Sequence, residues 1–254
     1  MPAEVPALGS RRCHALVALL CAAAMTGCAS GSGQAGREVS LRPSAAQQGA
    51  NKPDDLDSVD TEKSGRAVYA DVITALIDQE QYYAALAHIQ QQQRQQGNTD
   101  QLRFLEAEAR RHLGQSSEAE KLYKQLLRSS FAAQSHRGLG LLYAPRDINA
   151  AVQHLREAVQ REPTNAGMRN DLGYALMSGG RYREALTEIA TAVELEPGLD
   201  KARNNLIVLL ILSRDEAGVK RVAAAGSVND KSLASLRRQA QNLSSRVATS
   251  QGVK

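Results

Sequence analysis

The chain has 254 residues, of which 4% are aromatic and none is Trp, and its formal net charge is +4. So few aromatic residues, beside abundant Ala, Leu, Gln and Arg, disfavour a β-sandwich or barrel and favour packed helices. The positive charge is spread along the chain, with no basic stripe that alternates with aromatic residues. We therefore expect no nucleic-acid partner.

The first 27 residues have the pattern of an export signal. Arg11 and Arg12 precede an apolar run at residues 13–26. A helix of that length rises about 21 Å, which is short of the roughly 30 Å hydrocarbon core of a membrane. The pattern therefore predicts a signal peptide at 1–27 and not a membrane span. All three cysteines lie within the first 28 residues, so no disulfide framework is expected in the rest of the chain.

The apolar run ends in Met-Thr-Gly-Cys at residues 25–28, which resembles the lipobox of bacterial lipoproteins, with Met where Leu is commoner. The resemblance implies cleavage before Cys28, a diacylglyceryl group on its sulfur and an N-acyl chain, which together hold a protein firmly on a membrane. The alternative is an ordinary secretory signal cut near Ala24 or Ala29. Because Ala29 is not the Asp that retains lipoproteins in the inner membrane, we expect the periplasmic face of the outer membrane.

Residues 28–64 are predicted to form a disordered tether that begins at the lipidated Cys28. They are rich in Gly, Ser, Ala, Gln and Pro, and they lack periodic apolar residues, so ordering them would cost more free energy than it gains. Gly31, Gly33 and Gly36 have the spacing of the dinucleotide-binding fingerprint. That motif needs a strand before it and a helix after it, and neither is indicated. We predict no cofactor besides the lipid.

Residues 66–225 carry a pattern that recurs about every 34 residues. In its clearest copy, at 166–199, Gly173 and Ala185 would let two helices cross closely, Gly180 suits the turn between them, and Pro197 ends the second helix. The pattern resembles the tetratricopeptide repeat (TPR), a hairpin of two helices.

The resemblance implies an all-α fold, a right-handed superhelical TPR solenoid, because a lone hairpin cannot bury its apolar faces. Repeats are expected at 66–99, 100–132, 133–165 and 166–199, with a partial one at 200–225. A C-terminal capping helix is expected at 226–247 and a disordered tail at 248–254. The alternative, an irregular helical bundle, would not keep the repeat register.

In TPR domains the first helix of each hairpin lines a concave groove that binds peptides. Asn can bond a peptide group through both its donor and its acceptor, and Tyr and Met offer adaptable contacts. For each candidate the alternative is a solvated or inter-repeat residue. By the resemblance, the candidate groove residues are Phe104, Glu108, Arg111, Arg137, Leu141, Asn170, Tyr174, Met177, Asn204 and Val208.

Nothing in the sequence indicates catalysis or a metal site. The histidines of the repeats lie at non-equivalent positions without the spacing of metal ligands. No nucleophile-elbow or zinc-protease motif occurs, and no paired carboxylate recurs in an apolar setting. We predict no enzyme activity and no small-molecule substrate.

A lipidated repeat protein of this length resembles two groups of envelope lipoproteins. Residues 171–174 and 204–206 look more like the TadD lipoproteins of tight-adherence (Flp) pilus systems than like the pilotin lipoproteins of type IVa pili. The TadD resemblance implies that the groove binds a secretin or another pilus assembly component. The alternatives are a pilotin and an activator of a cell-wall enzyme, and a catalytic lipoprotein is the weakest of these hypotheses.

Overall fold

The computed structural model describes residues 68–252, and these residues form helices and turns without a strand. The predicted signal peptide, Cys28 and the tether lie outside the described residues. The first helix includes residues 68–78. It is followed by α2 (Tyr82–Gln96), α3 (Asp100–His112), α4 (Ser116–Gln125), α5 (Ala132–Tyr143), α6 (Ile148–Arg161), α7 (Ala166–Ser178), α8 (Tyr182–Leu195), α9 (Asp200–Leu212), α10 (Glu216–Ala225) and α11 (Asp230–Gly252).

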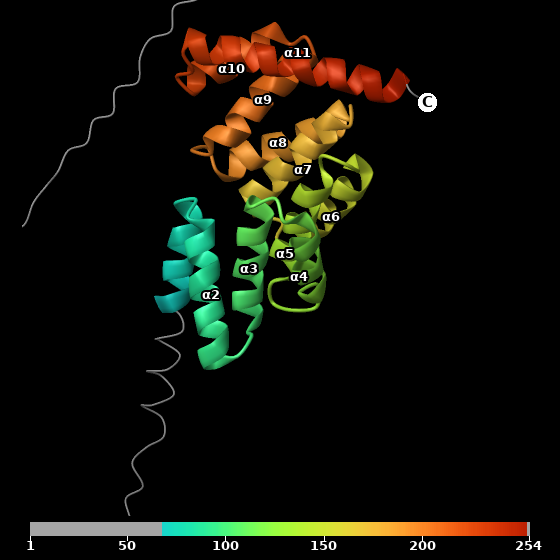
Figure 1. Cartoon of the computed structure of the whole chain (residues 1–254). Helices are drawn as coiled ribbons and strands as arrows, with labels where there is room; N and C mark the ends of the chain where they lie inside the picture. The colour runs from blue at the N-terminus through green and yellow to red at the C-terminus, as the bar shows by residue number, and fades with distance from the viewer. Residues whose placement is uncertain (1–67, 253–254) are drawn as a thin grey trace, which may run out of the picture. The chain divides into compact units, whose positions relative to one another are not determined.

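The helices form five hairpins in chain order (Figure 1). The helix at 68–78 shares an apolar cluster with α2 and forms the first hairpin, and the later hairpins are α3–α4, α5–α6, α7–α8 and α9–α10. Each hairpin packs on the next, because α2 contacts α3, α4 contacts α5, α6 contacts α7 and α8 contacts α9. The first helices of successive hairpins also contact one another, from α3 through α5 and α7 to α9. The predicted all-α stack of hairpins is confirmed.

Small residues set the distance between the two helices of a hairpin. A Cβ added at Gly173 would overlap with Cγ1 of Ile189 and meet the carbonyl oxygen of Ala185 on α8. Gly140 lies in the same way against Leu155 on α6. The predicted role of Gly173 is therefore confirmed, and the third hairpin uses the same device.

In four of the five described hairpins the turn uses left-handed backbone at the equivalent place, and the α5–α6 turn does not. Gly180 has φ +75° and Gly114 has φ +73°, a conformation that glycine adopts at little cost. Glu80 and Arg214 hold the same turn in the first and fifth hairpins, each with φ 60°. Pro197 lies in the turn after α8, as predicted, and the side chain of Asn165 caps α7 by accepting the backbone N–H of Met168.

The C-terminal end differs from the expectation in two ways. The fifth unit is a complete hairpin, because its second helix, α10, forms as well. The last helix, α11, runs from Asp230 to Gly252, so residues 248–252 are helical and not a disordered tail. Within this last stretch the hydroxyl of Thr249 donates to the carbonyl oxygen of Ser245.

The apolar core is divided unequally along the stack. One continuous cluster extends from α5 through α6, α7, α8, α9 and α10 to α11, where it takes in Leu236, Ala240 and Leu243. The helix at 68–78, α2 and α3 share a separate cluster, and a third one joins α3, α4 and α5 around the fully buried Tyr123. The C-terminal hairpins and α11 therefore share one large core, beside a small cluster of Ala166, Ala192 and Ala202, whereas the N-terminal hairpins rest on smaller ones.

Candidate partner-binding groove

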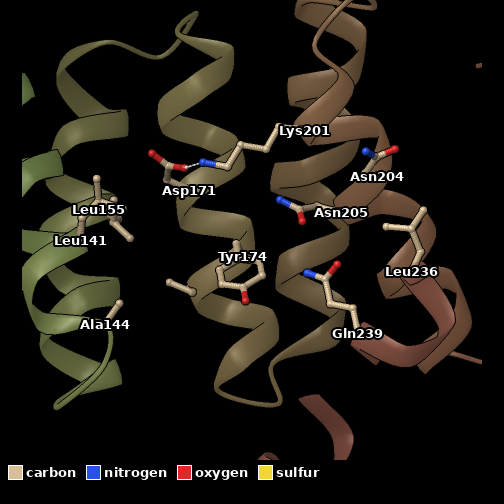
Figure 2. Close-up of a pocket in the computed structure, with 11 residues that line it drawn as sticks. Leu141, Ala144, Leu155, Asp171, Tyr174, Lys201, Asn204, Asn205, Leu236 and Gln239 are labelled. Carbon is tan, nitrogen blue, oxygen red and sulfur yellow. Dashed lines mark hydrogen bonds and ion pairs between the residues drawn. The ribbon is translucent and has the colours of Figure 1, made fainter. Parts of the chain in front are cut away.

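A groove lies along the first helices of the last three hairpins, with α11 as its opposite wall (Figure 2). Its first cavity has a volume of about 610 Å³. Leu141, Leu155 and Leu236 supply apolar wall, and Tyr174 projects between them. The remaining lining residues are Ala144, Asp171, Ala175, Lys201, Asn204, Asn205 and Gln239.

A second cavity of about 480 Å³ continues the first. The two share Ala144, Tyr174 and Ala175, so they form one groove. In the second cavity α11 contributes Leu243 and Arg246. We call the two cavities together the α11 groove.

An acid on the floor of the groove ties three hairpins together. The Asp171 side chain is 3% exposed, and its carboxylate accepts from Nε of Arg137 on α5 at 2.7 Å and from Nζ of Lys201 on α9 at 3.0 Å. A buried carboxylate needs such partners, because an isolated charge there would lose its hydration without compensation. Asp171 therefore fixes the spacing of α5, α7 and α9 and presents two cations at the groove.

A second polar contact lies beside the first. Nδ2 of Asn205 donates to Oδ1 of Asn170 at 2.8 Å, and both residues are buried. Asn170 is 1% exposed, so its amide holds α7 to α9. The prediction that Asn170 is exposed in the groove is therefore wrong. Its amide is buried between the two helices, where the amide of Asn205 supplies the hydrogen bond that a buried polar group needs.

Three of the candidate residues line the groove, namely Leu141, Tyr174 and Asn204. Arg137 reaches it through its ion pair with Asp171. Met177 and Val208 have no exposed surface and belong to the continuous core, so their assignment to the groove is corrected. Both side chains point between hairpins, where burying an apolar side chain contributes more stability than exposing it at a groove.

The candidates in the second hairpin lie away from the α11 groove. Phe104 stacks on Phe131 with ring centroids 5.3 Å apart. Glu108 accepts the hydroxyl of Tyr123 and pairs with Arg111 at 2.7 Å, and the pKa of Tyr123 is raised by burial and by the charge of Glu108. These side chains join α3 to α4 and α5. The polar groups of the second hairpin are therefore bonded within the stack.

Several groove residues were not predicted. Lys201 lies one helical turn before Asn204 on α9, so the same repeat-position argument would have found it. Leu236, Gln239, Leu243 and Arg246 are on α11, which is not a repeat element. Its placement against α9 depends on tertiary packing, for which the repeat pattern holds no signal.

The structure also brings together two histidines that look unrelated in the sequence. Nδ1 of His136 on α5 lies 3.1 Å from Nδ1 of His154 on α6, so one ring donates and the other accepts. Tyr143 stacks on His154 and donates its hydroxyl to Glu120 on α4. Hydrogen bonds from Lys124 and Tyr143 lower the pKa of Glu120 to about 2. Burial is the main cause that lowers the pKa of both histidines.

Within residues 68–252, no three His, Cys, Asp or Glu side chains are grouped so that they could hold a metal ion. None of the helices in this part of the chain is both long and apolar enough to cross a membrane.

Comparison with known proteins identifies the repeat. Residues 142–215 match a family model described as tetratricopeptide repeat, and this range includes the second half of the α5–α6 unit, all of α7–α8 and α9. This part of the chain is therefore similar to the TPR family. The five hairpins of the chain, with small residues at the helix crossings, are the TPR arrangement carried beyond the matched range.

A curated relative supports the same assignment. The TPR repeat-containing protein PA4299 of Pseudomonas aeruginosa is 41% identical over 101 residues, which is 39% of this chain and 41% of that protein. The match therefore spans less than half of the relative's length.

Solved TPR structures share the fold at low sequence identity. PilF of Pseudomonas aeruginosa has a TM-score of 0.59 and 15% identity, over 74% of this chain and 89% of that one. The TPR protein TTC0263 of Thermus thermophilus has a TM-score of 0.54 and 17% identity, over 70% of this chain and 97% of that one. MamA of Desulfovibrio magneticus has a TM-score of 0.50 and 17% identity, over 68% of this chain and 95% of that one. At such identities the likeness concerns the TPR fold alone.

Proposed function

We propose that this protein is a non-catalytic adaptor that holds a protein partner in the α11 groove while a lipid on Cys28 anchors it to the periplasmic face of the outer membrane. The observation that carries the proposal is the open groove, with apolar walls and few but well-placed polar groups. Sites of this composition bind side chains of a partner, because the walls provide apolar burial and the polar groups fix its orientation.

The proposed process is assembly of a tight-adherence pilus, with a secretin or another assembly component as the partner. It is supported by the resemblance of residues 171–174 and 204–206 to TadD lipoproteins. Both segments lie at the groove, because Asp171, Tyr174, Asn204 and Asn205 line it. The lipobox-like residues 25–28 support the anchor.

The test is recovery of partners from detergent-solubilised envelopes with an epitope-tagged full-length chain. We expect a secretin or another pilus assembly protein to be enriched, and mass spectrometry of the peptide that begins at residue 28 to show the lipid. The matched control is Cys28→Ser. Without the lipid, this variant should no longer be found in the membrane fraction. Recovery of peptidoglycan enzymes in place of pilus proteins would replace the pilus role by activation of a cell-wall enzyme, and an unmodified Cys28 would end the anchoring proposal.

A further inference from the structure

We infer that the α11 groove takes an amphipathic helix of the partner, with an apolar stripe that enters the groove and acidic residues at its sides. This inference rests on the proposed function, because it specifies the partner segment that the adaptor holds. Three observations support it: the direction of the groove, the way α11 itself is bound, and the charge of the groove.

The groove follows the helix axes. Along α7 the lining residues run from Asp171 in the first cavity to Ser178 in the second, which is about 10 Å of helix. Along α11 they run in the same order from Leu236 to Arg246, about 15 Å. Because both walls are helices that extend along the groove, its shape fits a rod laid between them.

The protein already binds one helix on this surface. Leu236, Ala240 and Leu243 of α11 are buried at helical spacing, and α11 packs on α9, the first helix of the fifth hairpin. The equivalent surface of α5 and α7 lies next to α11 and is still open. A partner helix there would continue the interface that α11 has begun.

A helix also fits the small number of free polar groups in the groove. An extended peptide would need partners for its backbone along its whole length, but the amides of Asn170 and Asn205 are bonded to each other, which leaves the amides of Asn204 and Gln239 in the first cavity. A helix brings its backbone hydrogen bonds already made, so it needs only apolar contact and a few side-chain pairs.

The groove carries an excess of positive charge. Lys201, Arg146 and Arg246 line its two cavities, and Asp171 is the one carboxylate among the lining residues of these cavities. Asp171 is 3% exposed and is shared by Arg137 and Lys201, and Arg146 pairs with Glu120 of α4, so the four cations Arg137, Lys201, Arg146 and Arg246 stand against two carboxylates. The side chains of Lys201 and Arg146 are 63% and 48% exposed and remain accessible to a partner. Acidic residues at the sides of a partner helix would therefore be attracted, and basic ones repelled.

Three labelled peptides of about 18 residues, long enough for five helical turns, test the inference on the purified full-length chain. All carry the same Leu stripe at helical spacing. One has Glu at the remaining positions, one has Lys, and one is the Glu peptide with two central prolines that prevent a helix. Fluorescence anisotropy measures binding. We expect the Glu peptide to bind at least about tenfold more tightly than either of the others.

Two variants locate the binding in the groove. Ala144→Phe fills the place where the two cavities meet, and Arg246→Glu reverses a charge at the rim. Each should weaken binding of the Glu peptide about fivefold or more. The control is Arg183→Glu, an exposed residue of α8 outside both cavities, which should bind like the unchanged protein. Circular dichroism verifies that each variant is folded.

The inference is overturned by equal binding of the Glu and Lys peptides, by equal binding of the proline peptide, by no binding of any peptide, or by groove variants that bind like the control. These outcomes do not depend on the anchor or on the pilus. If a pilus protein were recovered but the acidic peptide bound no better than the others, only the inference about the helix would be wrong. If the acidic peptide bound as expected but no pilus protein were recovered, only the pilus role would be wrong.

Discussion

The two ends of the hairpin stack bury their apolar side chains to different extents. From α5 to α11 most of the buried side chains form one large cluster, beside a small one of Ala166, Ala192 and Ala202, and the third and fourth hairpins cross at Gly140 and Gly173. From residue 68 to α4 the core is split into two clusters, and the residues equivalent to those glycines are Ile73 and Ala107. The repeat register is thus kept from one end of the stack to the other, while the size of the shared core varies from hairpin to hairpin.

The two halves also differ in whether the predicted groove residues are free to contact a partner or are used in packing. In the second hairpin Phe104, Glu108 and Arg111 are occupied by contacts with α4 and α5. In the third to fifth hairpins the shared cluster that includes α11 provides the core, so Leu141, Tyr174 and Asn204 remain available at the groove. The more cohesive half is therefore the half that we propose binds the partner.

The largest effect is expected from Met177→Ala. Met177 is fully buried in the continuous core, so truncation should lower the free energy of unfolding by about 3 kcal/mol and shift the main thermal transition. Ile73→Ala removes a fully buried side chain from the N-terminal cluster and serves as the comparison. Its effect should be confined to faster hydrogen exchange of the amides before α4. Equal shifts of one common transition in both variants would show that the two halves unfold as one.

A smaller effect is expected from Gly173→Ala. The added methyl group would overlap with Ile189, so α7 and α8 must separate, at a cost of about 1–3 kcal/mol in unfolding free energy. Gly198→Ala is the matched control, since a Cβ at Gly198 meets no atom within 4 Å. Chemical denaturation measures both. If the variant were as stable as its control, the close crossing would not be what holds the C-terminal hairpins together.

The smallest effect is the change of stability with pH that comes from the two histidines at the junction of the two halves. Burial lowers the pKa of His136 and His154 in the folded protein, so below the ordinary value of 6.5 the unfolded chain binds more protons than the folded one. The contribution of the two neutral histidines to the free energy of unfolding is therefore fully present above pH 6.5, and it falls as the solution is acidified below that pH. We expect the melting temperature to drop by about 2 °C between pH 7.5 and 5.5.

Replacing one ring, as in His154→Gln, should reduce that drop. Glu120 does not interfere, because its pKa of about 2 means that its contribution is present above the ordinary value of 4.5 and is lost only in more acidic solution. A drop that is unchanged in His154→Gln would show that other groups are responsible.

The sequence predicted the features that recur. Gly173, Gly180 and Pro197 recur with the repeat period, and the resemblance of that pattern to the TPR predicted a stack of two-helix hairpins, which the structure has. The end of α11 did not follow, because residues 248–252 lack apolar periodicity and continue a helix that has already begun.

The groove could be predicted only in part. Residue position within the repeat identified Leu141, Tyr174 and Asn204, but it does not say which way a side chain rotates. It therefore placed Met177 and Val208 in the groove instead of the core. The wall formed by α11, and the meeting of His136 with His154, depend on how helices far apart in the chain cross.

The left-handed turns have a consequence for where the molecule comes apart. At the inner positions this backbone is carried by Gly114 and Gly180, but at the two outermost hairpins it falls on Glu80 and Arg214, whose Cβ atoms make it unfavourable by about 1 kcal/mol each. The stored strain sits at the ends of the stack, where each hairpin has a neighbour hairpin on one side only. Because α11 packs on α9 and extends the core over the fifth hairpin, fraying should start at the turn of the first hairpin and travel toward the C-terminus.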